Sequence, residues 1–182
     1  VSLGGNFGFR ITGADIEVAA TDVSAQLAAG DFSVGVEDGS LAMLLAADDS
    51  IALSATGTFV FEGGDFANAS ATLVTVSLND STTDYAATPL TISIDGVSAD
   101  LTAGLNIQSV SVVGLAIDIS GFVSLGGDFG FRITGADIEV AATDVSAQLA
   151  AGDFSVGVED GSLAMLLAAD NSIALSATGT FV

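Results

Sequence analysis

Acidic turns are the strongest candidates for chemistry in this sequence. The candidate side chains are Asp31, Glu37, Asp38, Asp48 and Asp49, and their counterparts Asp153, Glu159, Asp160 and Asp170. Calcium takes about six to eight oxygen ligands, so carboxylate-rich turns indicate possible calcium sites. The sequence has neither an EF-hand loop nor a GGxGxD nonapeptide, and the prediction therefore rests on composition. The alternative interpretation is solvated turns and charges that protect sheet edges.

The common catalytic constellations lack their parts. There is no histidine, cysteine or lysine, which excludes Ser-His-Asp, Cys-His, Ser-Lys and Schiff-base chemistry. Phosphate-binding glycine motifs are also missing. A carboxylate pair could cleave a glycoside, but 23 acidic residues would produce such a pair by chance. We expect no enzyme activity, and a carbohydrate-active enzyme is a remote alternative.

The charge balance narrows the possible partners. The formal net charge is −21, with Arg10 and Arg132 as the only basic side chains. Nucleic acid and anionic membranes are excluded as partners because both are bound through Lys and Arg. Such an acidic chain without cysteine fits a secreted protein at the cell surface or outside the cell, where cations screen its charge. We expect each arginine to pair with a carboxylate across strands or between repeats, the alternative being an exposed side chain that contributes little.

A long internal repeat organises the chain. Residues 1–60 recur as residues 123–182 with two differences, because Asn6 becomes Asp128 and Asp49 becomes Asn171. Residues 61–122 resemble a diverged half-unit, which suggests an older unit of about 61 residues. We therefore divide the chain into half-unit A (1–60), half-unit B (61–122) and a second half-unit A (123–182). We expect it to be a fragment of a longer repeat array.

Apolar and small or polar residues alternate along most of the chain, which predicts half-buried strands. Turn residues recur at Gly4-Gly5-Asn6, Thr12-Gly13-Ala14, Gly30-Asp31, Glu37-Asp38-Gly39, Asp48-Asp49-Ser50, Gly63-Gly64-Asp65, Asn79-Asp80 and Asp95-Gly96. Asp-Gly predicts hairpins over Val34–Leu45 and Ile92–Leu101. The segment from Thr21 to Gly30 fits a strand or a helix, and we favour the strand because its neighbours are strands.

The predicted fold is all-β. We expect antiparallel meander or sandwich units stacked into an elongated rod or filament, and a β-solenoid is the alternative. The phenylalanines are expected to form the core and the packing between repeats. They are Phe7, Phe9, Phe32, Phe59, Phe61, Phe66, Phe122, Phe129, Phe131, Phe154 and Phe181.

The pattern GGxFxF…DVSAxL…FSVGVxDGSLAML…SIALSAxGTFV resembles the tandem repeats of giant bacterial extracellular, adhesin-like surface proteins. The resemblance covers the whole chain and implies secretion and a surface or matrix role. Our first functional hypothesis is a structural protein that forms or extends a filament, sheath or biofilm-matrix element, with copies of itself as partners. The alternative is a spacer, or a calcium-rigidified region of an adhesin that binds a cell surface or glycans.

Overall fold

The computed structural model describes residues 1–182, and all of its regular structure is β-strand. The strands are β1 (Ser2–Thr12), β2 (Asp15–Ala29), β3 (Phe32–Leu45), β4 (Ile51–Gly63), β5 (Ala67–Asn79), β6 (Leu90–Ile94), β7 (Val97–Leu101), β8 (Ile107–Ile119), β9 (Val123–Thr134), β10 (Asp137–Ala151), β11 (Phe154–Leu167) and β12 (Ile173–Phe181). No helix has the length and apolarity needed to span a membrane. The all-β prediction is confirmed.

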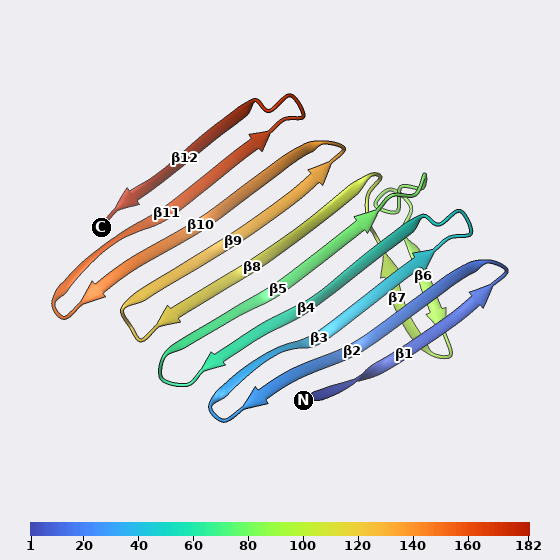
Figure 1. Ribbon diagram of the computed structural model, residues 1–182, viewed down its shortest axis with the longest axis horizontal. Helices are drawn as coiled ribbons and strands as arrows, with labels where there is room; N and C mark the ends of the chain where they lie inside the picture. Colours follow the sequence, from blue (N-terminus) through green and yellow to red (C-terminus); the bar gives the residue numbers. More distant parts are fainter.

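Ten strands form one sheet in the order β1-β2-β3-β4-β5-β8-β9-β10-β11-β12, and every neighbouring pair is antiparallel (Figure 1). Strands β6 and β7 form a separate hairpin. The sheet is therefore a long antiparallel meander, which is one of the architectures predicted from the sequence. The expected stacking of units into a rod is not visible in a single chain of this length.

The repeated sequence forms the same four strands twice within this sheet, as β1–β4 and as β9–β12. Residues 61–122 are arranged differently, since they supply the sheet strands β5 and β8 and carry the β6–β7 hairpin between them. One 122-residue period thus contributes six neighbouring strands to the sheet. At about 4.8 Å between strands, a period spans about 29 Å across the sheet.

The two Asp-Gly sequences form different structures. Asp95 (φ 49°) and Gly96 (φ 90°) both have positive φ, as a tight two-residue turn requires, and they join β6 to β7. Asp38 has φ 50°, but Gly39 does not adopt positive φ, and the chain continues straight through β3. The predicted hairpin over Ile92–Leu101 is confirmed, whereas the one over Val34–Leu45 is wrong because Asp38 forms a β-bulge.

Two further local predictions have clear outcomes. Gly4-Gly5-Asn6 is not a turn, because it lies within β1 where the register shifts opposite a bulge in β2. Gly5 has φ 135°, and a Cβ there would lie 3.0 Å from the Cα of Val23. The segment from Thr21 to Gly30 is a strand, as favoured, since β2 extends to Ala29.

Bulges near the middle of the strands keep the large apolar side chains on one face. In β2 the apolar positions change from even (Ile16, Val18) to odd (Val23), and in β3 they change from even (Val36) to odd (Leu41). Each change occurs at a residue with positive φ, Asp22 in β2 and Asp38 in β3. A bulge places two residues opposite one, so it restores the alternation that the sequence interrupts.

We call the result the apolar face, defined by one aligned row across all ten strands. The row is Phe7, Ala20, Leu41, Ala55, Val76, Val110, Phe131, Val140, Met165 and Leu175. Paired residues share a face, so the register alone places these side chains together. The row passes from Phe7 in the first copy to Phe131, the counterpart of Phe9, in the second. The register therefore moves by two residues per period.

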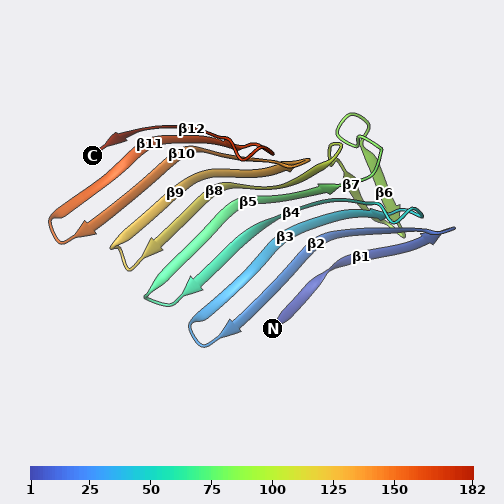
Figure 2. The same cartoon turned by 45° about the horizontal axis from the view of Figure 1, so that its top comes forward.

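The opposite surface is the small-residue face, defined by Gly8, Ala19, Ala42 and Ser54 and by their counterparts in the second copy. The β6–β7 hairpin packs on this face over β1–β4 (Figure 2). The buried cluster of the protein lies there and contains Ala19, Ala42, Ala52, Tyr85, Ile92, Ile94, Ala99, Leu101 and Ala103. Small side chains on the sheet allow Ile92 and Leu101 of the hairpin to approach closely and become fully buried.

Gly8 and Gly130 occupy the same repeat position but have different surroundings, which provides a matched test of hairpin packing. A Cβ on Gly8 would lie 2.8 Å from the Cβ of Ile94, whereas a Cβ on Gly130 would meet no atom within 4 Å. We expect Gly8→Val to destabilise the chain by about 1–3 kcal/mol. The expected fall in Tm is about 2–4 °C per kcal/mol.

Gly130→Val is the control, because valine suits an exposed strand and should leave the Tm unchanged or slightly higher. Thermal unfolding of both variants followed by circular dichroism decides the outcome. Equal effects of the two substitutions would contradict the observed difference between the two copies.

Candidate functional site

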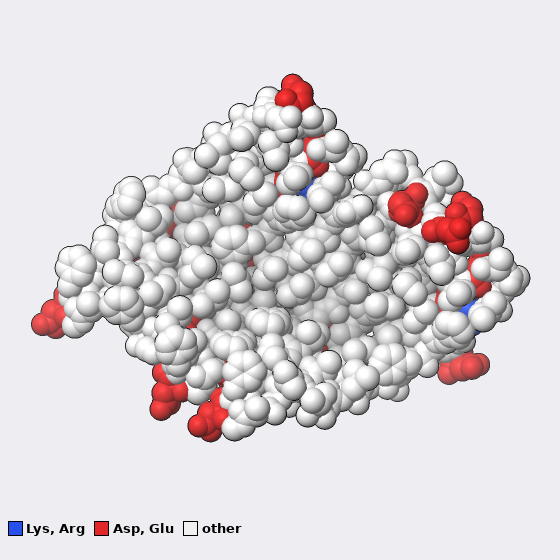
Figure 3. Space-filling model, viewed as in Figure 1, with Lys and Arg blue, Asp and Glu red and all other residues white.

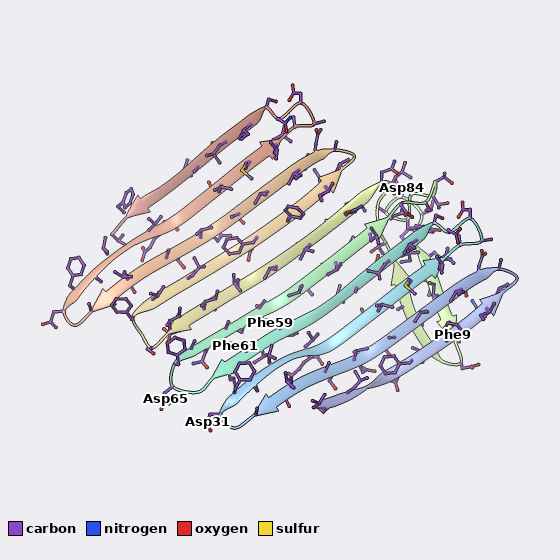
Figure 4. The ribbon with its side chains drawn as sticks, in the orientation of Figure 1. Phe9, Asp31, Phe59, Phe61, Asp65 and Asp84 are labelled. Carbon is purple, nitrogen blue, oxygen red and sulfur yellow. The ribbon has the colours of Figure 1, made fainter.

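The predicted calcium ligands do not meet at one place. Asp31 lies between β2 and β3, Glu37 and Asp38 lie within β3, and Asp48 and Asp49 follow the far end of β3. At about 3.4 Å per residue, the 14 residues of β3 separate the two ends by about 44 Å. Figure 4 shows Asp31 and Asp65 in turns at one end of the sheet and Asp84 at the other.

The second copy repeats this separation. Asp153 lies between β10 and β11, Glu159 and Asp160 lie within β11, and Asp170 follows it. No three carboxylates of the chain are grouped closely enough to hold a metal ion. The structure therefore divides the candidates into single residues and adjacent pairs, and calcium binding stays a prediction.

In the loop after β3, the pKa of Asp48 is altered by its surroundings. Asp48 accepts hydrogen bonds from the Ser50 hydroxyl (2.7 Å) and the Ser50 N–H (3.1 Å). These bonds, the hydroxyl first, hold the pKa of Asp48 below its ordinary value. Ser172 lowers the pKa of Asp170 in the same way. Each of these carboxylates is thus held by hydrogen bonds from a serine of its own loop.

Removing the Ser50 hydroxyl should therefore raise the pKa of Asp48 towards its ordinary value. A carboxyl group whose pKa is depressed by folding stabilises the protein above its unfolded pKa, and this contribution disappears as the pH falls through the folded pKa. We expect Ser50→Ala to weaken the acid resistance of this loop slightly. Carboxyl NMR titration measures the shift, and Asp170 in the same molecule is the internal control. An equal shift of both residues, or of neither, would refute the assignment.

Each arginine pairs with a glutamate on the adjacent strand, as predicted. The Arg10 guanidinium donates to Glu17 Oε2 through Nε (2.7 Å) and Nη2, and Arg132 does the same to Glu139. Both pairs lie on the small-residue face. Arg10 also donates through Nη1 to the Ser93 carbonyl of β6 at 3.1 Å. The first pair therefore ties the hairpin to the sheet.

The two positions that differ between the copies have local explanations. Asp49 and Asn171 have φ 66° and 65°, a conformation that Asp and Asn both tolerate. Asp128 Oδ1 accepts the N–H of Gly114 at 2.7 Å, and Gly114 is the bulge residue of β8. Strand β1 has no such neighbour, and there Asn6 donates to Asp22 at 2.9 Å instead. The aspartate at position 128 thus accepts a hydrogen bond from β8, a neighbour that β9 has and β1 lacks.

The apolar face is the most extensive candidate for a functional surface. No part of the chain covers it, and most of its large side chains are partly or fully exposed. Phe9 is 62% exposed and Phe131 is 41% exposed. Figure 3 shows this side of the molecule as uncharged over its middle, with carboxylates gathered at the margins. Contiguous exposed apolar surface is a feature of interaction surfaces, which makes this face a candidate.

The expectation that phenylalanines form the core is wrong for this chain. The strand phenylalanines lie on the apolar face, while Phe66 and Phe122 lie in turns. Phe32 and Phe61 make an edge-to-face contact with ring centroids 5.4 Å apart. Figure 4 shows Phe59 and Phe61 projecting from the same strand, β4. The buried cluster is built instead from alanines of the sheet and aliphatic residues of the hairpin.

The sheet has two unpaired edges. Strand β1 pairs only with β2, and β12 pairs only with β11. Their counterparts inside the sheet, β9 and β4, have a second partner in β8 and β5 respectively. Each edge therefore exposes backbone N–H and C=O groups that are hydrogen-bonded at the equivalent internal position.

Asn79, which the sequence marks only as part of the Asn79-Asp80 turn, also has a structural role. Its buried side chain donates to the carbonyls of Thr83 (2.8 Å) and Ala103 (3.1 Å) and accepts from Ser81. These bonds fix the point at which the chain leaves β5 for the hairpin. A single asparagine carries no sequence signal for this role. Its burial, which reveals the role, is seen only in the structure.

No protein-family model, curated protein or solved structure matches this chain.

Proposed function

We propose that this is a structural, secreted repeat protein whose sheet extends from repeat to repeat and assembles with copies of itself through the apolar face. The observation that carries the proposal is the row of ten aligned apolar residues on a face that the chain leaves uncovered. A sheet is stable in water when its apolar face packs against a second layer.

The repeat supports extension within the same sheet. The two near-identical copies lie in the same sheet, separated by β5 and β8, and both outer edges of the sheet are unpaired. Addition of a β5-like strand to β12, or of a β8-like strand to β1, would reproduce a pairing that the sheet already contains. The acid content and lack of cysteine support a location outside the cell, in a filament, sheath or matrix.

Copies of this chain are the favoured partner for the apolar face. Two such faces can pack about 10 Å apart as in a β-sandwich, with their phenylalanine and aliphatic side chains interdigitated. The carboxylates gather at the margins of the face (Figure 3), so their repulsion opposes this packing less than charges within the face would, and salt screens it. Self-association would therefore bury the apolar row while leaving the acidic turns in solvent.

We expect the double variant Phe131→Thr/Val140→Thr to weaken self-association about a hundred-fold or more. Each apolar side chain contributes about 1.5–3 kcal/mol when buried, and about 1.4 kcal/mol corresponds to a factor of ten. Threonine preserves strand propensity, so the monomer should stay folded. Analytical ultracentrifugation over a concentration series measures the change.

Phe66→Thr is the matched control, because Phe66 is 69% exposed but lies in the turn between β4 and β5. It should associate like the unsubstituted chain. A chain that stays monomeric at all concentrations before substitution would refute assembly through this face.

If the sheet extends from repeat to repeat, the length of the molecule should increase with the number of repeats. Chains with one, two and three 122-residue periods should grow by about 29 Å per added period, because each period adds six strands. Small-angle X-ray scattering gives the maximum dimension of each chain at low concentration. A maximum dimension that hardly changes with repeat number would show that the repeats collapse onto one another instead.

A further inference from the structure

The hairpin and the first copy of the repeat form a specific interface. Burial alternates along the hairpin from Thr91 onwards, so that Ile92, Ile94 and Leu101 face the sheet while Thr91 and Asp100 face solvent. The Thr102 N–H donates to Ser54 Oγ at 2.9 Å on the sheet. Together with the bond from Arg10 to Ser93, this fixes the hairpin by polar as well as apolar contacts.

The second copy presents the same surface without a hairpin. Its residues Gly130, Ala141, Ala164 and Ser176 are the counterparts of Gly8, Ala19, Ala42 and Ser54. Ala141, Ala164 and Ser176 are exposed, whereas their counterparts are buried. An open groove of about 770 Å³ lies over these residues and is bordered by Arg132 and Glu139.

Every group that holds the hairpin in the first copy is therefore duplicated. Ser176 carries an Oγ without a protein partner, where Ser54 accepts the Thr102 N–H. Arg132 pairs with Glu139, but its Nη1 has no carbonyl like that of Ser93 to bind. Gly130 leaves the space that Ile94 occupies above Gly8.

The resident hairpin cannot serve this second surface. The segment that carries the hairpin, residues 80–106, leaves the sheet at the end of β5, next to β4. At this point Asp80 exchanges hydrogen bonds with Ile51. The equivalent departure point in the second copy lies beyond β12, because β12 is the counterpart of β4. Four strand spacings, or about 19 Å, separate β8 from β12. The hairpin of a second, intact chain is likewise already occupied by that chain's own first copy.

We propose that the small-residue face of β9–β12 is the docking site for a further copy of residues 80–106. This copy is carried by the segment that pairs with the free edge of β12. The inference rests on the proposed extension of the sheet. It adds that the hairpin of each half-unit B covers the small-residue face of the half-unit A that precedes it. The free edge of β12 and the uncovered groove are thus two parts of a single vacant interface.

The test uses the chain extended after Val182 by residues 61–122, since Val182 is the counterpart of Val60. The protein has no cysteine, so a single Ser176→Cys substitution reports the accessibility of the groove. In the 182-residue chain this thiol should react rapidly with a maleimide. In the extended chain we expect labelling to slow about a hundred-fold, because docking makes the site accessible only through local opening.

Ser54→Cys is the matched control, because this site is already covered in the 182-residue chain and should label slowly in both proteins. Gly130→Val supplies a second readout. It should leave the Tm of the 182-residue chain unchanged and lower that of the extended chain by several degrees, through the clash that Ile94 makes above Gly8.

The outcomes separate this inference from the proposed function. If hydrogen exchange shows that β12 amides gain protection while Ser176→Cys still labels rapidly, the sheet extends and hairpin docking is overturned. If neither changes, the proposed extension of the sheet and hairpin docking both fail, whereas assembly through the apolar face is judged by ultracentrifugation alone.

A cyclic peptide of residues 80–106 tests docking without the extension. Its ends lie close together because Asn79 and Ile107 are paired in the sheet. We expect it to slow labelling of Ser176→Cys in the 182-residue chain in a concentration-dependent manner. If the extended chain misfolds and the peptide gives no slowing, the docking proposal is overturned.

Discussion

The position of the bulges is the constraint on which the rest of the structure depends. Ten strands of up to 15 residues would turn their apolar side chains to both faces if each followed simple alternation. Left-handed residues such as Asp22 and Asp38, and Asp144 and Asp160 in the second copy, correct the alternation at mid-strand. One face consequently becomes continuously apolar and the other small and polar. The bend visible along the strands lies in the same region (Figure 2).

This division gives the two faces different kinds of contact. The small-residue face offers glycine and alanine positions at which a neighbouring backbone can approach closely, and it provides a serine and an arginine for hydrogen bonds. Such a surface recognises one partner geometry, which is the β6–β7 hairpin. The apolar face has no comparable polar contacts, so a layer packed on it would be held mainly by the burial of apolar area.

Much of this fold could be predicted from the sequence, and the failures have physical causes. Alternation and turn residues predicted the strands, the antiparallel pairing and the Asp95-Gly96 turn, and the charge balance predicted a carboxylate partner for each arginine. The Asp38-Gly39 hairpin failed because an Asp with positive φ starts either a turn or a bulge, and the parity change from Val36 to Leu41 is what distinguishes them. The acidic turns lie at opposite ends of long strands, a separation that composition does not reveal. The identity of the core also escaped prediction, because burial of Ala19 and Ala42 depends on a hairpin far away in the sequence.

The direction of the backbone hydrogen bonds has a mechanical consequence. In this sheet they run from strand to strand, along the direction in which repeats would be added. A pulling force along that direction would load each strand pair in series, so the weakest pair would set the breaking force. The hairpin contacts β1, β2, β3 and β4 together and lies across three of these pairs. It would act as a strap in parallel with them, sharing the load and making the four strands yield as one unit.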